Sequence, residues 1–328
     1  MSPRELALIG AGRIGQIHAA NIAAHPDLAL AWIVDPVAEA AEALARRTGA
    51  RTGTLEAALA DPEVAGVVVA SATDTHLDIC RRAHAAGKAI FCEKPLDLDL
   101  ARARQAAAEL AGARLLLGFN RRFDPNFEAL KARLDDGSIG GLETLQITSN
   151  DPGPPPIAYV EVSGGLFKDM AIHDFDMARW LMGEAPTEVF AWGSCLVDPA
   201  IGQAGDVDTA RTVLRTASGR LCVIANSRRS GFGYDQRIEA YGSAGMVRAD
   251  NVTESTTRVW TETGAQADRF QNFFLERYRE AYRQEMAHFA EIVCGRAEPR
   301  IGYADGLAAL ALAEAAAESV STGGVVRL

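Results

Sequence analysis

Lysine is scarce in this chain, and both an excess of basic charge and long apolar runs are missing from it. Only four of the 33 basic residues are lysines, and 43 acidic residues give a formal net charge of −10. Proteins that bind the nucleic-acid backbone usually carry excess basic charge, so no nucleic-acid partner is expected. No run approaches the roughly 18 apolar residues of a membrane helix. The N-terminus also lacks a charged segment followed by an apolar one, so we expect neither a membrane partner nor a signal peptide.

The cysteines are few, odd in number and widely spaced. No two of them have the CxxC spacing that redox and zinc sites use, so we expect neither a disulfide framework nor a cysteine zinc site. Small buried thiols are the simplest interpretation, and together with the missing signal peptide they predict a cytoplasmic protein. The five residues are Cys80, Cys92, Cys195, Cys222 and Cys294.

Short apolar runs alternate with segments of helical length in the first 119 residues. Runs of about four to seven residues rich in Val, Ile, Leu and Ala are typical of strands buried on both faces of a parallel sheet. Strands that alternate with helices predict a doubly wound α/β fold. The expected strands are Leu6–Ile9, Leu28–Val34, Val67–Ala70, Ala89–Cys92 and Leu115–Phe119, and the expected helices are Ile14–Ala24, Val37–Arg47, Thr75–Ala86 and Leu98–Leu110.

The first of these strands leads into a glycine motif, Gly10-Ala11-Gly12-Arg13-Ile14-Gly15, which opens a helix. In this context the glycines allow a tight turn, a close approach of the backbone to a pyrophosphate and close packing of helix and strand. Asp35 closes the second strand and can accept hydrogen bonds from the adenosine ribose. Its charge would repel a 2′-phosphate, so we predict NAD rather than NADP, although Arg13 could contact a phosphate. The alternative is a structural glycine turn with an N-capping aspartate.

Glu93-Lys94-Pro95 follows the fourth expected strand. Ligands of doubly wound sheets bind at the carboxyl ends of the strands, so Lys94 is expected on the nicotinamide side, with Glu93 beside it. The alternative is a surface lysine next to a turn proline. The segment after the third strand ends at the same edge, and its candidates for lining the cofactor are Ala72, Thr73 and His76.

The chain after residue 119 has a different pattern, with short strands joined by turns. Such a pattern predicts a largely antiparallel sheet, and an open face of it is a candidate oligomer surface. Because 328 residues exceed one ordinary core, two domains are expected. We predict a Rossmann domain at residues 1–119 and a substrate-binding and oligomerisation domain at 120–328, with the last helix a candidate for packing on the first. The expected strands are Leu142–Thr148, Thr187–Leu196, Asp208–Thr216, Leu221–Asn226, Gln236–Tyr241, Met246–Ala249 and Thr256–Trp260.

Asp169 and His173 lie four residues apart on a predicted helix that ends at Gly183. One helical turn separates such residues, so both lie on one face. A histidine with a neighbouring carboxylate is typical of a general base. The alternative is a histidine at the start of a helix that is satisfied by a nearby aspartate. Asp174 and Asp176 are also of residue types that bind metals. These two side chains do not share a helical face with Asp169 and His173, so no metal is expected.

The glycine motif with Asp35, the Glu93-Lys94-Pro95 segment, and Asp169 with His173 together resemble one family. It is the glucose-fructose oxidoreductase, inositol dehydrogenase and rhizopine-catabolism family (Gfo/Idh/MocA), and the resemblance covers essentially the whole chain. Within the family, the chain is most similar to bacterial myo-inositol 2-dehydrogenases. The matching stretches are Gly118–Pro125, Asp151–Pro156, Gly164–Trp180 and Gly233–Glu239.

The resemblance implies a role for each of three catalytic residues. Lys94 hydrogen-bonds the reacting hydroxyl, His173 accepts its proton, and Asp169 orients His173. A cis peptide bond before Pro95 is also implied. The general chemistry agrees, because a positive charge stabilises a developing alkoxide and an imidazole with a reference pKa near 6.5 suits the proton step.

The resemblance further implies a polyol substrate and a homotetramer built through the open sheets. The segments around Asn150, Asp151, Tyr234 and Tyr282 would join the catalytic residues in binding the polyol. The predicted activity is NAD-dependent oxidation of myo-inositol to 2-keto-myo-inositol (scyllo-inosose). Two alternatives stay open: a dehydrogenase of the same family that acts on scyllo-inositol, chiro-inositol or a pyranose, and a dinucleotide sensor that has lost catalysis.

Overall fold

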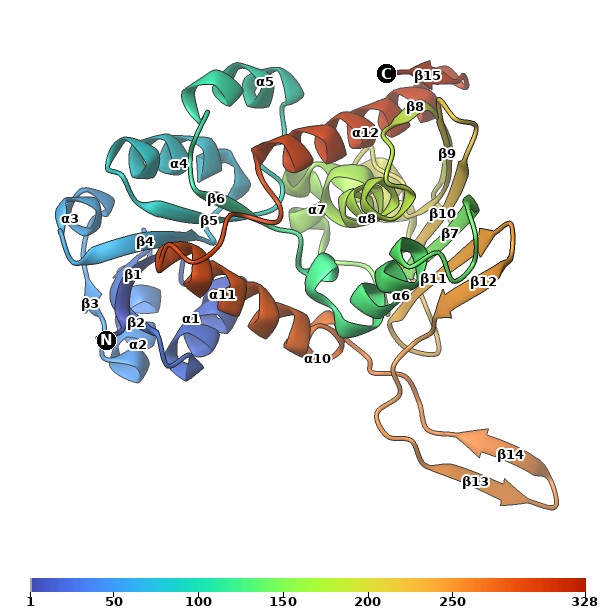
Figure 1. The fold of residues 1–328 in the computed structure, drawn as a ribbon, viewed down its shortest axis with the longest axis horizontal. Coiled ribbons are helices and arrows are strands. Elements are labelled where there is room, and N and C mark those ends of the chain that lie inside the picture. The colour runs from blue at the N-terminus through green and yellow to red at the C-terminus, as the bar shows by residue number, and fades with distance from the viewer. Residues whose placement is uncertain (1) are drawn as a thin grey trace. The chain divides into compact units, whose positions relative to one another are not determined.

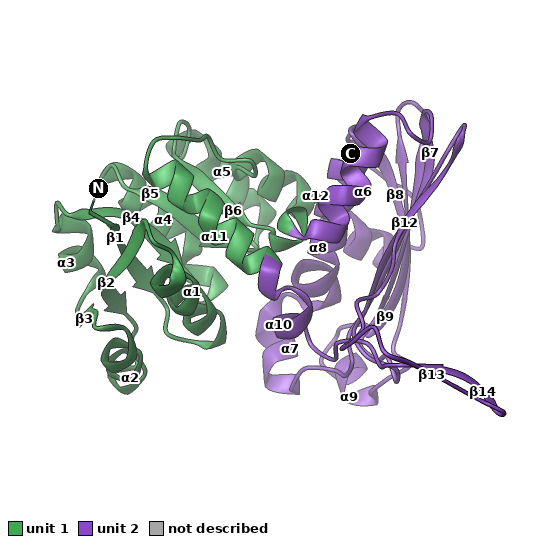
Figure 2. Cartoon of the chain, turned by 60° about the horizontal axis from the view of Figure 1, so that its bottom comes forward, with its two compact units in different colours: residues 1–123, 281–310 green, residues 124–280, 311–328 purple. Residues whose placement is uncertain are grey.

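A computed structural model describes residues 2–328, which pack as two compact units (Figure 2). Within the described residues, unit 1 comprises residues 2–123 and 281–310, and unit 2 comprises residues 124–280 and 311–328. The domain boundary predicted after residue 119 stays a prediction. The units divide the chain differently, because unit 1 also takes in a segment that is remote in sequence.

The sheet of unit 1 has six parallel strands in the order β3-β2-β1-β4-β5-β6 (Figure 1). In β1, β4 and β5 the apolar residues are almost wholly buried, as the runs of Val, Ile and Leu predict. The expected doubly wound fold is confirmed. The strands are β1 (Arg4–Ile9), β2 (Leu28–Val34), β3 (Arg51–Thr52), β4 (Val64–Val69), β5 (Ala89–Glu93) and β6 (Leu115–Gly118).

Helix α11 completes the core of unit 1, although it is remote in sequence from the sheet. The rings of Phe289 and Phe91 pack edge to face with centroids 5.8 Å apart, and Gly66 leaves room for Phe289. The helical segments of the unit include those that connect its strands, η2 after the last strand, and α11 itself. They are α1 (Arg13–Ala24), α2 (Ala38–Thr48), α3 (Leu55–Ala60), η1 (Thr73–Thr75), α4 (His76–Ala85), α5 (Leu100–Glu109), η2 (Asn120–Phe123) and α11 (Arg279–Val293).

Unit 2 contains a seven-stranded sheet in the order β12-β11-β7-β10-β9-β8-β15. All neighbouring pairs are antiparallel except β7 and β10, which confirms the mostly antiparallel sheet. The strands are β7 (Leu142–Asn150), β8 (Pro186–Ser194), β9 (Thr209–Thr216), β10 (Leu221–Ser227), β11 (Asp235–Gly242), β12 (Gly245–Ala249) and β15 (Val326–Arg327).

One face of this sheet is covered by helices and the other carries exposed side chains. Burial alternates along β9 and β10 with the period of two that a half-covered sheet requires. The helices are α6 (Pro125–Asp135), α7 (Ile157–Ser163), α8 (Ile172–Met182), α9 (Pro199–Gln203), α10 (Phe274–Arg277) and α12 (Tyr303–Thr322), of which α12 begins in unit 1.

A separate hairpin extends from the rest of unit 2 (Figure 1). Its strands, β13 (Arg258–Thr261) and β14 (Gly264–Ala267), pair only with each other among the described residues. The predicted strand Thr256–Trp260 therefore lies in this hairpin rather than in the large sheet. Short, exposed strands of this kind give a weak apolar signal in sequence.

Glu285 is a fully buried acid on α11, and within residues 2–328 neither of its carboxyl oxygens has a hydrogen-bond partner. Burial raises the pKa of Glu285 well above its usual range, and the nearby charge of Glu93 adds to the shift. The folded protein therefore retains a proton that the unfolded chain releases above about pH 4.3. It follows that the free energy of unfolding falls as pH rises above that value, toward the raised pKa.

Replacement of Glu285 by glutamine, which cannot ionise, should remove this pH-dependent loss. We expect the stability of Glu285→Gln relative to the unmodified protein to increase between pH 5 and pH 8 in urea unfolding experiments. The exposed Glu318→Gln is the matched control and should show no such trend. Parallel stability profiles for Glu285→Gln and the parent would contradict the prediction.

Candidate active site

The predicted cofactor-binding residues of unit 1 all lie at or after the carboxyl ends of neighbouring strands. Strands β2, β1, β4 and β5 are adjacent and parallel, so the segments that leave them lie at one edge of the sheet. The sheet thereby brings together, by topology, a set of segments that is scattered in sequence. These hold Gly10, Gly12, Arg13, Ile14, Gly15, Asp35, Ala72, Thr73, His76, Glu93 and Lys94.

The glycine loop has the geometry that a pyrophosphate needs. Gly10 adopts φ +104°, and a Cβ there would lie 2.4 Å from the carbonyl oxygen of Ala70. A Cβ on Gly15 would lie 2.0 Å from the carbonyl oxygen of Gly10. A Cβ on Gly12 would meet nothing within 4 Å, so the loop is open at the N-terminus of α1. The first and third glycines are thus required by packing, whereas the second leaves space for a ligand.

Asp35 is held in place by the backbone of the same edge. One carboxyl oxygen accepts the Ala11 N–H at 2.7 Å, and the other accepts the Val37 N–H at 2.8 Å. Each oxygen of a carboxylate can accept a second hydrogen bond, so the pair remains able to bind the two hydroxyls of an adenosine ribose. The residues of this edge therefore fit NAD.

Replacing Asp35 with serine should weaken NAD binding and reduce the preference for NAD over NADP. Loss of a charged acceptor costs about 1.5–3 kcal/mol, and every 1.4 kcal/mol is tenfold, so we expect the KM for NAD to rise about tenfold or more. Initial rates with both cofactors measure the change. Asp78→Ser removes an exposed aspartate of α4 and is the control. An unchanged ratio of kcat/KM for the two cofactors would show that Asp35 does not select NAD.

His76 joins the segment after β4 to the segment after β5. Its Nδ1 lies 2.8 Å from the Pro95 carbonyl oxygen and its Nε2 lies 3.2 Å from the Ser71 carbonyl oxygen. Burial lowers the pKa of His76, against the effect of these hydrogen bonds. Both ring nitrogens face the backbone, so the ring braces the loop that carries Lys94. The Lys94–Pro95 peptide bond is cis, as the resemblance implied.

Glu93 lies beneath this loop in a buried polar group. The Nε2 atom of His18 is 2.7 Å from Oε1 of Glu93, and the His18 ring packs edge to face on Phe91 and Tyr282. The structure thus places Glu93 at the end of a buried strand, with its side chain engaged by α1.

Unit 2 carries the predicted general base on an unusual turn. Asp169 lies in a π-helical turn, Phe167–Ala171, and His173 lies in the first turn of α8, which continues it. The sequence predicts a regular helix here, and the wider turn is a difference that residue types do not signal. Such turns are common at functional sites.

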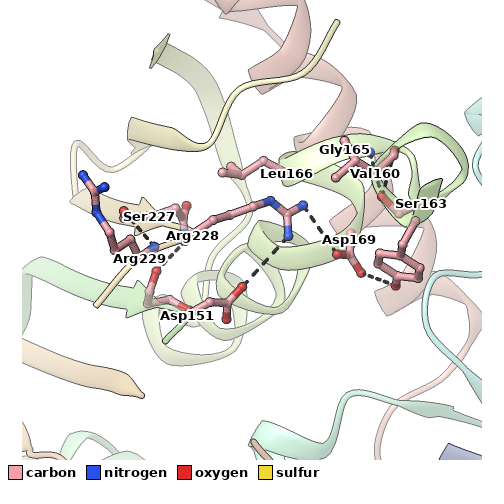
Figure 3. A network of polar contacts seen from close by, with 12 residues as sticks. Asp151, Val160, Ser163, Gly165, Leu166, Asp169, Ser227, Arg228 and Arg229 are labelled. Atoms are coloured by element: carbon pink, nitrogen blue, oxygen red, sulfur yellow. Dashed lines mark hydrogen bonds and ion pairs between the residues drawn. The ribbon is translucent and has the colours of Figure 1, made fainter. Parts of the chain in front are cut away.

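Two partners that the sequence did not single out hold Asp169 (Figure 3). The hydroxyl of Tyr159 donates to its Oδ1 at 2.9 Å, and Nη2 of Arg228 lies 3.5 Å from its Oδ2. Tyr159 comes from α7 and Arg228 follows β10. Neither belongs to a short motif, so no local signal could have found them.

The residues predicted to bind a polyol fall into both units. Asn150, Asp151 and Tyr234 belong to unit 2, where Asn150 pairs with Asp235 in the register of β7 and β11 and donates to it at 3.2 Å. Tyr234 immediately precedes β11 and is buried. Tyr282 belongs to unit 1, where its ring contacts His18.

Neither a metal cluster nor a membrane span is found in the described part of the chain. Among residues 2–328, no three His, Cys, Asp or Glu side chains gather in a way that could hold a metal ion. Over the same residues, every helix is too short or too polar to span a bilayer.

Comparisons with known proteins agree with this geometry. A model of an oxidoreductase family with an NAD-binding Rossmann fold matches residues 4–119, and a model of the Gfo/Idh/MocA C-terminal domain matches residues 127–248. The inositol 2-dehydrogenase of Rhizobium meliloti is 47% identical over 316 residues, which cover 96% of each protein. The structure of a myo-inositol dehydrogenase from Corynebacterium glutamicum has a TM-score of 0.95 and 44% identity, over 100% of this chain and 99% of that one.

A more distant structure carries ligands. It is a scyllo-inositol dehydrogenase from Lactobacillus casei with bound NAD(H) and scyllo-inositol, with a TM-score of 0.92 and 27% identity over 99% of both chains. Because both family models match and relatives are similar over nearly their full length, the chain belongs to the Gfo/Idh/MocA family of NAD-binding oxidoreductases.

Proposed function

We propose that this protein is an NAD-dependent dehydrogenase that oxidises myo-inositol to 2-keto-myo-inositol (scyllo-inosose). The observation that carries the proposal is the near full-length identity of 47% with an inositol 2-dehydrogenase. The chain also has Lys94, Asp169 and His173, the three residues that the proposed chemistry requires.

The oxidation removes a hydride from the C2 carbon and a proton from its hydroxyl, which leaves a ketone. When bound, NAD accepts the hydride. Lys94 stabilises negative charge on the reacting oxygen, and His173 accepts the proton. Asp169 orients the imidazole and stabilises it once it is protonated.

The proposed substrate is neutral, so its recognition needs hydrogen bonds rather than a cluster of basic residues. Asn150, Asp151, Tyr234 and Tyr282 are the proposed partners of the hydroxyls that do not react. Amide, carboxylate and phenol groups together supply both donors and acceptors, which suits a ring that presents a hydroxyl on every carbon.

A substrate panel tests the proposal. We would follow NAD and NADP reduction with myo-inositol, scyllo-inositol, chiro-inositol, glucose and xylose, and measure NAD binding separately. Fast reduction of NAD with myo-inositol is the expected result. Activity confined to another polyol would replace the substrate and keep the chemistry. Binding of NAD without turnover of any polyol would favour a sensor.

We also propose that the open face of the large sheet forms a homotetramer interface. Strand register places Phe190, Trp192, Val223, Tyr241 and Met246 on that one face, and four of these are at least 40% exposed. Large exposed apolar groups on a sheet face are typical of an interface. Light scattering of the purified protein tests this, because a mass of one chain would reject it.

We propose a cytoplasmic location because the cysteines form no disulfide bonds among the described residues. All five are free thiols, and three of them are buried. Free thiols are typical of a reducing compartment. Localisation of a tagged protein outside the cytoplasm would contradict this part of the proposal.

A further inference from the structure

Arg228 is the largest of the fully buried side chains, and it follows directly on strand β10. Its side chain is only 2% exposed. A buried guanidinium must be compensated by nearby charge, since an isolated buried cation is strongly unfavourable. Figure 3 shows how it is compensated, with the guanidinium directed toward Asp169 and Asp151.

Three carboxylates from three segments surround this guanidinium. Nη2 lies 3.5 Å from Oδ2 of Asp169 and 4.0 Å from Oδ2 of Asp206, and Nη1 lies 4.0 Å from Oδ2 of Asp151. These distances are those of ion pairs rather than hydrogen bonds. The carboxylates belong to the π turn, to the segment before β9 and to the segment after β7.

Backbone hydrogen bonds fix the frame around this group. The Asp151 N–H donates to the Ser227 carbonyl oxygen at 2.9 Å, and the Arg228 N–H donates to the Asp208 carbonyl oxygen at 2.8 Å. Asp206 in turn accepts the Leu166 N–H, just before the π turn. Arg228 therefore stands on the rigid end of the sheet and reaches the turn that carries the proposed base.

The planar guanidinium has two ends, and here they serve two different carboxylates. Nη1 faces Asp151 and Nη2 faces Asp169, so one side chain sets the separation of a proposed substrate-binding group from a proposed catalytic one. A lysine ammonium would keep the charge but could not hold both, because it is a single point charge on a flexible stem.

We propose that Arg228 is a positioning residue that holds Asp169 and Asp151 in register, and through Asp169 sets the orientation and basicity of His173. The inference rests on the proposed roles of Asp169 and His173 in alcohol oxidation. It deepens that function by naming the group on which the general base depends.

Two other charged groups near this turn have partners of their own. Lys168 pairs with Glu314 of α12 at 2.9 Å, and Asp174 accepts a hydrogen bond from Asn226 of β10 at 2.8 Å. Tyr159 of α7 contributes a neutral donor to Asp169. Arg228 thus places a positive charge within 4.0 Å of Asp169.

The test compares Arg228→Met, Arg228→Lys and the matched control Arg229→Met. Arg229 is the exposed neighbour, and its side chain is directed away from the group (Figure 3). We would measure kcat and KM for myo-inositol from pH 6 to 10, NAD affinity by fluorescence, and the titration of the His173 ring by NMR.

For Arg228→Met we expect kcat/KM to fall about tenfold or more with unchanged NAD affinity. Loss of the positive charge favours protonated imidazole, so the His173 midpoint should move to higher pH by about half a unit or more. Arg228→Lys should keep the midpoint near that of the parent but lose several-fold in kcat/KM. Arg229→Met should match the parent in every measurement.

A folded Arg228→Met variant with the parent's midpoint and kcat/KM would overturn the proposal. If Arg228→Met does not fold, Arg228→Lys is the deciding variant. Full activity of Arg228→Lys would show that a guanidinium contacting both carboxylates is not required. A merely structural role would lower the melting temperature without moving the midpoint. Should the parent oxidise none of the polyols, the NMR midpoint still tests Arg228, so failure of the proposed function is a separate outcome.

Discussion

Replacing Lys94 or His173 with alanine is expected to lower kcat about a hundredfold or more, while NAD still binds. Lys94→Ala removes the positive charge that stabilises the developing alkoxide. His173→Ala removes the acceptor of the hydroxyl proton, which water would have to replace. The glycine loop and Asp35 remain intact in both variants. Lys94 belongs to another segment of unit 1, and His173 belongs to unit 2.

The measurement is steady-state turnover at saturating NAD, with NAD affinity followed by fluorescence. Lys88→Ala is the matched lysine control, since Lys88 donates to the Asp61 carbonyl oxygen away from the glycine loop. His84→Ala, on α4, is the matched histidine control. Both should turn over like the parent. Near-normal turnover in Lys94→Ala or His173→Ala would remove that residue from the catalytic set.

Arg277→Met should produce the largest loss of stability, about 3–5 kcal/mol in the free energy of unfolding. The guanidinium pairs with Asp124, and each side chain is only 2% exposed. It also lies over the rings of Phe127 and Tyr278. Removing it leaves the Asp124 carboxylate buried without its counter-charge, which is more costly than losing the contact itself.

Urea unfolding with Asp124→Asn and the double variant tests the origin of this loss. Asp124 also caps α6 by accepting the N–H groups of Asn126 and Phe127, and asparagine can keep that role. The double variant should therefore be more stable than Arg277→Met alone. Arg133→Met, which breaks an exposed pair with Asp136, should change little. Purely additive effects of the two buried replacements would contradict an uncompensated charge as the cause.

Unit 1 was predictable where the signal is local. The glycine motif, Asp35 and Glu93-Lys94-Pro95 each follow an apolar run, and parallel strands necessarily bring their ends to one edge. Strand β3 has only two residues, both exposed, and α3 has only six. Both are therefore too short for a pattern of apolar residues to predict them. The assignment of α11 to unit 1 depends on packing between Phe289 and Phe91, which sequence spacing does not encode.

The proposed catalytic residues of unit 2 stand out in the sequence, but the residues that contact them do not. Asp169 and His173 are recognisable because four residues separate a carboxylate from a histidine. The π turn uses the same residue types as an α-helix, so the pattern cannot distinguish the two. Arg228 and Tyr159 reach Asp169 from segments 59 and 10 residues away in sequence. Only the folded chain brings them together.

The discontinuity of unit 1 imposes an order on synthesis and folding. Its core needs Phe289 and Met286 of α11, both buried, and the Leu117 N–H donates to the carbonyl oxygen of Ile301. When residue 280 leaves the ribosome, the apolar surface that α11 covers is still open, although the whole of β1 to β6 has emerged. The N-terminal segment of unit 1 therefore cannot finish folding first, as most N-terminal domains do. It stays incomplete until nearly the entire polypeptide has been made, and during this interval its open apolar surface can aggregate.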